Sequence, residues 1–183
     1  YNGNEPAEWV MGQAAGRGKL TDNHPSPDYV GGFIQFRNGV RGTVELGAGA
    51  PDVPEVDYWW RKNRVSVFGT EGFAEVLTGG GWRAVTGEGA SSGEGCMNYD
   101  LDMPPYVQEI ADWLSEDKLH SCNFESAYAG FEIVMGLCRS IIEGGQVALP
   151  LAEGMDEMAA LREIVPDRPV ILSTPANEKE YGS

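Results

Sequence analysis

Two strand-turn-strand patterns follow one another in the first half of the chain, and they constrain its fold more than any other feature. The first spans residues 29–46 and has Asn38-Gly39 between two runs rich in β-forming residues. This dipeptide favours a type I′ hairpin turn, because both residues tolerate positive φ angles. The second spans residues 64–77 and folds over a turn flanked by glycines. Together the two patterns predict an antiparallel meander.

Other strands are predicted on both sides of this meander. Residues 7–15 form a candidate first strand, and residues 82–86 are a candidate late strand. Residues 86–98 are rich in Gly, Ser and Glu, a composition typical of a surface loop. Beyond this loop the period of the apolar residues changes from two residues, typical of strands, to 3.6 residues, which indicates helices.

Three helices are predicted in the second half of the chain. The first begins near Pro105, because proline is favoured in the first turn of a helix. The second is capped by Asn123 and ends at Gly144-Gly145. The third covers about residues 155–164. The wide apolar stripe of the second helix predicts deep burial against a sheet; its members are Phe124, Ala127, Tyr128, Phe131, Val134, Met135, Cys138, Ile141 and Ile142.

Strands followed by helices predict an α+β fold, in which helices pack on one face of an open, mainly antiparallel sheet. We assign residues 1–165 to this domain and residues 166–183 to a polar C-terminal tail. The other face of the sheet is then either solvated or buried against another surface. The length of 183 residues is sufficient for one domain with its own core.

The composition excludes several classes of partner. The chain has 28 Asp and Glu against 13 Lys and Arg, so its formal net charge is −15. We therefore expect no nucleic acid and no membrane surface as partner. No apolar run approaches the length of a membrane span. The three cysteines show no framework spacing, which predicts reduced thiols and a cytoplasmic location. The first residue is Tyr1 rather than Met, which indicates a processed chain or a fragment.

Motifs for independent chemistry are rejected. The glycines of residues 87–93 miss the dinucleotide-binding spacing by one residue, and residues 16–20 lack the hydroxyl of a phosphate-binding loop. No Gly-x-Ser-x-Gly segment is present. His120 and Cys122 supply two metal ligands at most, so no metal site is predicted. Acidic pairs such as Glu153 with Asp156 are expected to be solvated.

The remaining candidates for ligand contact lie in two loops. His24 is flanked by Asn23 and Pro25, and a lone histidine in such a loop is more often solvated than a general base. The second candidate is an aromatic and basic cluster, and its members are Trp59, Trp60, Arg61 and Lys62. Aromatic rings stack on sugar-like rings while Arg and Lys donate hydrogen bonds. The same residue types are enriched in subunit interfaces, so both interpretations stay open.

Three segments resemble the C-terminal domain of the Gfo/Idh/MocA family of NAD(P)-dependent oxidoreductases. Residues 32–42 are similar to the family's strand, Asn-Gly, strand hairpin, and residues 65–72 to its strand followed by Gly-Thr-x-Gly. Residues 126–151 are similar to its late helix, which ends in Ser-x-x-x-Gly-x-x-Val-x-Leu-Pro-Leu. The order and spacing of these segments carry the resemblance.

The resemblance implies a parent enzyme that transfers hydride between NAD or NADP and a sugar, an inositol or a related polyol. This chain would form one wall of the substrate cleft and, through its open sheet face, a homo-oligomer (a dimer or a tetramer). The family's Rossmann domain and its Glu-Lys-Pro segment are not among residues 1–183. We therefore expect no catalytic residue in this chain, no cofactor bound by the chain alone, and no activity in isolation.

Two other functions are alternatives to this one. The chain could be a non-catalytic binding or assembly module with the same sheet. Independent catalysis through His24 and Arg61 is disfavoured.

Overall fold

The computed structural model describes residues 5–16, 27–47, 49–55, 63–78, 80–95 and 98–165. The chain divides into two compact units. The first unit contains residues 1–51 and 121–183, and the second contains residues 52–120. The predicted boundary between a domain of residues 1–165 and a tail remains a prediction, since residues 166–183 lie outside the described part.

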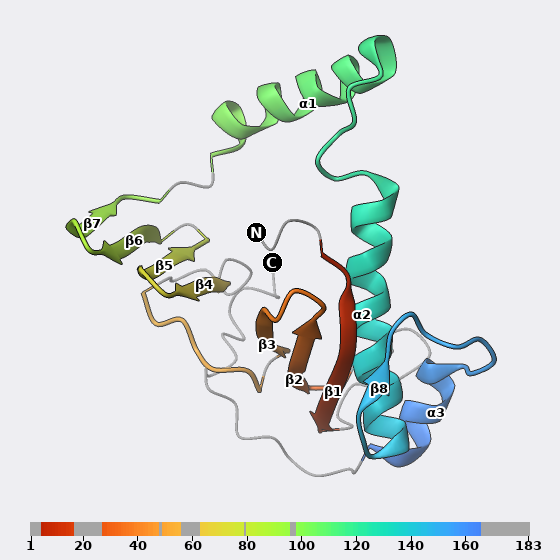
Figure 1. Ribbon diagram of the computed structural model, residues 1–183. Helices are drawn as coiled ribbons and strands as arrows, with labels where there is room; N and C mark the ends of the chain where they lie inside the picture. The colour runs from red at the N-terminus through yellow and green to blue at the C-terminus, as the bar shows by residue number, and fades with distance from the viewer. Residues whose placement is uncertain are drawn as a thin grey trace, which may run out of the picture. The chain divides into compact units, whose positions relative to one another are not determined.

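The first unit contains a four-stranded antiparallel sheet of order β3-β2-β1-β8 and two helices (Figure 1). Its elements are β1 (Ala7–Ala15), β2 (Tyr29–Phe36), β3 (Arg41–Leu46), α2 (Phe124–Glu143), β8 (Val147–Ala148) and α3 (Glu157–Ile164). The predicted first strand, first hairpin and second helix are therefore confirmed. The third helix begins two residues later than predicted, because the Asp156 side chain caps it by accepting from Ala159 N–H at 3.0 Å.

The turn between β2 and β3 differs from the predicted type I′. Gly39 has a φ of 88°, whereas Asn38 is not among the described residues with positive φ. Gly39 N–H donates to the Phe36 carbonyl at 3.0 Å, and Phe36 N–H donates to the Val40 carbonyl at 2.9 Å. This pattern is a three-residue loop in which a type I turn is followed by a left-handed glycine. The hairpin was predicted correctly and its turn type was wrong.

Helix α2 covers one face of the first sheet (Figure 1). Gly12 of β1 has no side chain where the helix passes, and a Cβ there would lie 2.6 Å from the Leu137 carbonyl oxygen. Gly12 N–H also donates to Ser140 Oγ at 2.8 Å. Close contact of strand and helix places Val10 and Leu137 at the centre of the core. Both side chains are fully buried.

The burial of α2 differs from the predicted stripe. The buried segment of the helix is its C-terminal part, Gly136 to Ser140, and it includes Leu137, which the predicted stripe omitted. Phe124, Tyr128 and Phe131 are exposed. The side of α2 that faces the core is therefore not the side that carries most of its large apolar residues. Gly12 and Gly136 allow this orientation, because the absence of their side chains lets β1 and the residues after β8 lie close to the helix.

A second core lies between α2 and α3. Cys138, Leu161 and Val165 are buried there. The Arg139 guanidinium holds the connection between the helices: its Nε donates to Glu157 Oε1 at 2.8 Å, and its Nη1 donates to the Ala152 carbonyl. Both charged side chains are buried, so they compensate each other in a low-dielectric environment.

The second unit contains a four-stranded antiparallel meander of order β4-β5-β6-β7 and helix α1. Its elements are β4 (Arg64–Gly69), β5 (Gly72–Leu77), β6 (Gly81–Thr86), β7 (Gly89–Gly93) and α1 (Tyr99–Glu116). The second hairpin and the strand after it are confirmed. The predicted loop of residues 86–98 is wrong in part, since residues 89–93 pair along β6 as a strand. Ladder hydrogen bonds outweigh the poor β-propensity of this Gly- and Ser-rich segment.

Helix α1 begins six residues before the predicted start. Asn98 Oδ1 accepts from Asp100 N–H at 3.0 Å, and Asp102 Oδ2 accepts from Asn98 N–H at 2.9 Å. These two bonds cap the helix upstream, so Pro104 and Pro105 lie inside it. The α+β class and the antiparallel pairing are confirmed, with the strands divided between two sheets. In the described part of the chain, no helix has the length and apolar character that a membrane crossing requires.

Candidate functional site

The residues predicted to contact a ligand all lie outside the described residues, and these are His24, Trp59, Trp60, Arg61 and Lys62. Their roles therefore remain predictions. The described residues that flank each of the two segments contact one another. Asp28 N–H donates to the Gly16 carbonyl at 2.9 Å at one end of the β1–β2 pair. Arg64 Nη2 donates to the Glu55 carboxylate at 3.0 Å, which joins the two ends of the segment with the tryptophans.

The face of the first sheet opposite α2 is the first described candidate surface. Because side chains alternate along a strand and the ladder register is regular from Trp9 onward, one face carries both aromatic and polar groups. Its members are Trp9, Met11, Gln13, Tyr29, Phe33, Gln35, Arg41, Thr43 and Glu45. We call this set the open face. Phe33 at its centre is 55% exposed.

Tyr29 and Glu45 show that the open face is partly ordered by its own contacts. A Cβ at Gly31 would lie 2.2 Å from Tyr29 Oη, so the absent side chain leaves room for the phenol ring. Tyr29 O–H donates to Glu45 Oε1 at 3.1 Å. Partial burial, followed by the hydrogen bond with the Glu45 carboxylate, raises the pKa of Tyr29. Tyr29 therefore stays neutral and donates at physiological pH.

A polar cluster on the second sheet is the next candidate. Glu75 is only 7% exposed, and it lies across the ladder from Ser66 and Arg83. Ser66 Oγ donates to it at 2.8 Å and Arg83 Nε at 3.0 Å, while Arg64 Nε lies at 3.8 Å. The hydrogen bond from Ser66, supported by the charges of Arg83 and Arg64, lowers the pKa of Glu75. A carboxylate held in its ionised form is a poor general acid, so this cluster stabilises the sheet.

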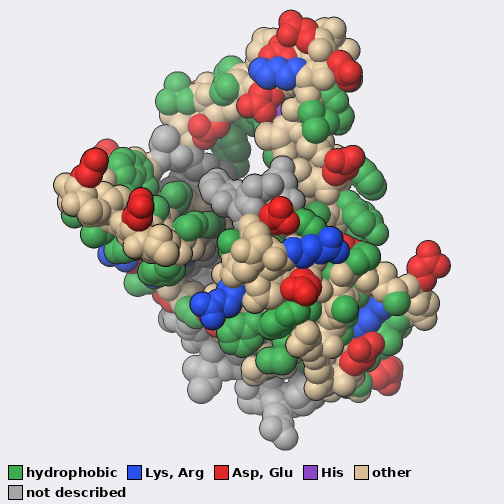
Figure 2. All heavy atoms as spheres, viewed as in Figure 1, with side chains coloured by type: hydrophobic (Ala, Val, Ile, Leu, Met, Phe, Trp, Pro, Cys, Tyr) green, Lys and Arg blue, Asp and Glu red, His purple; other side chains and the backbone are tan. Residues whose placement is uncertain are grey.

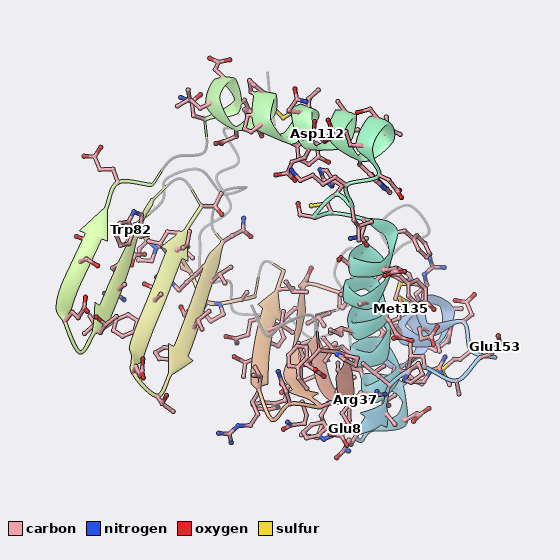
Figure 3. All side chains as sticks on the ribbon, turned by 45° about the horizontal axis from the view of Figure 1, so that its top comes forward. Glu8, Arg37, Trp82, Asp112, Met135 and Glu153 are labelled. Atoms are coloured by element: carbon pink, nitrogen blue, oxygen red, sulfur yellow. The ribbon has the colours of Figure 1, made fainter. Side chains whose placement is uncertain are left out.

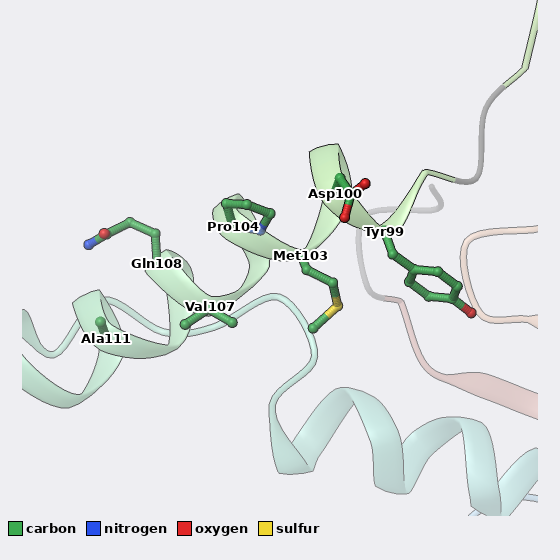
Figure 4. Close-up of a pocket in the computed structure, with 7 residues that line it drawn as sticks. All are labelled: Tyr99, Asp100, Met103, Pro104, Val107, Gln108 and Ala111. Atoms are coloured by element: carbon green, nitrogen blue, oxygen red, sulfur yellow. The ribbon is translucent and has the colours of Figure 1, made fainter.

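A hollow of about 490 Å³ lies along α1 (Figure 4). Seven residues of this one helix line it: Tyr99, Asp100, Met103, Pro104, Val107, Gln108 and Ala111. A substrate site needs polar groups that converge from several elements. Asp100 and Gln108 lie on the same helix, so the hollow lacks such convergence. We do not assign it as a substrate site.

His120, considered above as a metal ligand, is packed in an aromatic environment. His120 is buried, with 3% of its surface exposed. The centre of its ring lies 5.0 Å from that of Tyr106 and 6.2 Å from that of Trp113. Glu109 Oε2 lies 3.7 Å from His120 Nε2. Cys122 is exposed. Among the described residues, no three His, Cys, Asp or Glu side chains form a group suited to a metal ion. The contacts of His120 anchor the end of α1.

Sequence inspection missed the Glu75 cluster and the buried Arg139–Glu157 pair. Both depend on pairings between segments, and single residues such as Ser66 give no indication of them. The alternation of side chains along β4, β5 and β6 would indicate the Glu75 cluster only if the register of these strands were known. The second pair joins residues 18 positions apart, on either side of β8, and no local periodicity indicates such a pair.

Solved structures match this fold, although no protein-family model and no curated protein matches the sequence. An oxidoreductase from Agrobacterium radiobacter, in complex with NAD+, L-tartaric acid and magnesium, is 12% identical with a TM-score of 0.62; the match covers 78% of this chain and 43% of that chain. The aldose-aldose oxidoreductase from Caulobacter crescentus, complexed with glycerol, is 14% identical with a TM-score of 0.62, covering 79% and 42%. Levoglucosan dehydrogenase, in complex with NADH and levoglucosan, is 16% identical with a TM-score of 0.62, covering 80% and 46%.

These matches establish the fold of the chain. The matched structures are Gfo/Idh/MocA-type oxidoreductases, so the resemblance found in the sequence is confirmed at the level of the fold. The chain spans less than half the length of each of the three proteins.

Proposed function

We propose that this chain is the substrate-binding and oligomerisation domain of an NAD(P)-dependent dehydrogenase that acts on a sugar or an inositol-like polyol. The observation that carries the proposal is the fold match, which covers about four fifths of this chain and under half of each matched oxidoreductase. Two of these were solved with NAD+ or NADH, and all three with a hydroxylated ligand. A missing nucleotide-binding domain would account for the unmatched remainder of those chains.

The coding sequence upstream of Tyr1 tests this proposal most cheaply. We expect it to encode a strand followed by Gly-x-Gly-x-x-Gly and, further on, Glu-Lys-Pro. A start codon directly before Tyr1 would contradict the dehydrogenase and favour the non-catalytic module. The cofactor belongs to the upstream domain in this proposal, and NAD and NADP are both compatible with it.

The isolated chain is expected to be inert. Titration with NADH, followed by its fluorescence, should show no saturable binding to residues 1–183. A micromolar dissociation constant would show that the cofactor site is in this chain and would overturn the proposal. A cytoplasmic location is part of the same proposal, and the reduced thiols of Cys122 and Cys138 are consistent with it.

The open face is the proposed site of self-association. α2 covers the other side of the first sheet, so the open face is available to a second copy. It combines exposed apolar side chains such as Phe33 and Met11 with Arg41 and Glu45, which are complementary across a two-fold axis. Sedimentation velocity of the parent enzyme should show a dimer or tetramer, and Phe33→Glu should reduce it to a smaller species. A Val40→Glu control changes an exposed apolar residue in the hairpin turn and should leave the assembly intact.

A further inference from the structure

The turn between β2 and β3 carries the Asn38-Gly39 pair at its tip, and both residues are exposed. In such a pair the backbone nitrogen of the glycine can attack the side-chain amide carbon of the asparagine, because glycine has no Cβ to obstruct the approach. A Cβ placed on Gly39 would meet nothing within 4 Å, so the space around this residue is open. The pair is therefore a candidate site of deamidation.

The Asn38 side chain is already folded back over the glycine. Val40 N–H donates to Asn38 Oδ1 at 3.1 Å. A bond from a side-chain oxygen to the backbone two residues on defines an Asx turn, which brings the amide group over the peptide unit of Gly39. Holding the reacting groups in one short loop removes much of the entropic cost of the attack. The same N–H stabilises the negative charge that develops on Oδ1 as the amide carbon becomes tetrahedral.

The charges around the turn favour the same reaction. Residues 37–41 include Arg37 and Arg41 and no carboxylate, in a chain whose formal net charge is −15. Figure 3 shows Arg37 at one end of the first sheet, together with the exposed Glu8 of β1. Figure 2 shows basic side chains at the surface in the region of β1 to β3. The attacking nitrogen loses its proton, so the transition state is anionic and nearby guanidinium groups lower its energy.

We propose that Asn38 is a site of spontaneous deamidation in the folded chain, with isoaspartate as the main product. The Gly39 nitrogen bonds to Asn38 Cγ, its proton passes through water to the side-chain nitrogen, and that nitrogen leaves as ammonia. Water then opens the resulting five-membered imide. It adds mainly to the carbonyl carbon next to Cα, which the backbone nitrogen makes more electrophilic, and this opening gives isoaspartate. The inference is independent of the proposed function.

The product changes the end of the hairpin. Gly39 N–H donates to the Phe36 carbonyl at 3.0 Å, and this bond at the tip of the turn must open before the nitrogen attacks. Isoaspartate lengthens the loop by one backbone atom, so the bond from Phe36 N–H to the Val40 carbonyl no longer fits its geometry. The new carboxylate also offsets one of the two arginine charges. Deamidation therefore loosens the end of the β2–β3 pair and reduces its positive charge.

Asn98 provides a control within the same chain. Its Oδ1 also accepts from the N–H two residues on, that of Asp100, at 3.0 Å. The following residue is Tyr99, whose side chain obstructs the approach of its backbone nitrogen. Asp100 and Asp102 in the first turn of α1 place negative charge where the anionic transition state would form. Asn98 thus shares the hydrogen bond of Asn38 and lacks its other two features.

Peptide mass spectrometry of the full chain tests the proposal after incubation at mildly alkaline pH in water labelled with oxygen-18. Asn38 should lose its amide at least about tenfold faster than Asn98. Its product should carry one labelled oxygen and should react with an isoaspartate-specific methyltransferase. Equal rates at Asn38 and Asn98 would overturn the proposal. Aspartate as the only product would also overturn it, because direct hydrolysis of the side chain gives no isoaspartate.

Substitution of the two arginines tests the electrostatic part. Arg37→Gln combined with Arg41→Gln should slow the loss of the Asn38 amide about two- to fourfold. The matched control, Arg37→Lys combined with Arg41→Lys, keeps both charges and should keep the rate. Added salt should reduce the difference between the two variants, because it screens exposed charges. Equal rates in the two variants at low salt would overturn the role assigned to the arginines.

Discussion

The two units of this chain use similar elements and obtain their stability differently. Each has a four-stranded antiparallel sheet and at least one helix. In the first unit, α2 lies against β1 with a glycine at the contact, and two apolar clusters are buried around it. In the second unit, polar contacts such as the Glu75 cluster join neighbouring strands. The first unit therefore has its own apolar core, whereas Val53 is the one buried apolar side chain among the described residues of the second.

The largest effect on stability is expected for Arg139. Arg139→Ala leaves the Glu157 carboxylate buried without its partner and the Ala152 carbonyl without a donor. Loss of one member of a buried ion pair costs about 3–5 kcal/mol. Urea unfolding of the first unit measures this loss. The double change Arg139→Met with Glu157→Leu should recover most of it, and a loss below about 1 kcal/mol in the single variant would contradict a closed core around this pair.

Cys138 reports whether the core of the first unit is closed. Burial, supported by the Glu157 charge, raises the pKa of Cys138 from its ordinary value of 9.0 to about 11. A shift of two pH units lowers the thiolate fraction roughly 100-fold at neutral pH, so alkylation of Cys138 should be at least that much slower than alkylation of the exposed Cys122. Mass spectrometry in a Cys96→Ser background measures both rates. Equal rates would show that the core opens readily.

The same shift has a consequence for stability. Above pH 9 the Cys138 thiol loses its proton in the unfolded chain but keeps it in the folded chain. Its contribution to the free energy of unfolding is therefore complete below pH 9 and is lost as the pH rises from 9 towards 11. Cys138→Ala should remove this part of the loss of stability at alkaline pH.

Close packing of β1 on α2 predicts a smaller effect at Gly12. Gly12→Ala introduces a methyl group 2.6 Å from a backbone oxygen and should cost about 1–3 kcal/mol. Gly130→Ala is the matched control, since a Cβ there meets nothing within 4 Å. It should stabilise α2 by about 0.5–1 kcal/mol. Thermal unfolding of both variants checks the contrast, and a neutral Gly12→Ala would refute the close contact.

The smallest effect is expected at Glu75 in the second unit. Its pKa is lowered in the folded state, so its contribution is present above the unfolded pKa and is lost as the pH falls through the folded pKa. Glu75→Gln should destabilise the unit by about 1 kcal/mol at pH 7 and by less at pH 3. Urea titrations at the two pH values measure this. Equal losses at both would assign the effect to packing instead of charge.

Local chemistry made most of the fold predictable. Asn123 and Gly144 mark the ends of α2 because a cap and a left-handed glycine act on their immediate neighbours. Strand β7 was missed because its pairing comes from β6 and its own residues favour a loop. The core-facing side of α2 was missed because the position of Leu137 depends on glycines of another strand.

The candidate site was less predictable than the fold. His24, Trp59 and Trp60 lie outside the described residues, so their proposed role rests on residue type. The open face required the register of β1, β2 and β3, which determines that Phe33, Arg41 and Glu45 share a side. Sequence alternation gives the two faces of a strand, and only packing against α2 shows which one is open.

The central claim is that the first unit has its own apolar core around α2, whereas the described contacts of the second sheet are mainly the ladder pairs and the polar Glu75 cluster. Residue-resolved hydrogen exchange of the unmodified chain under increasing urea tests it most directly. The account predicts that amides of β1, β2 and α2 exchange slowest, and that amides of β5 and β6 exchange at a lower opening free energy. Exchange of the β5 and β6 amides as slow as that of β1, β2 and α2 would contradict it.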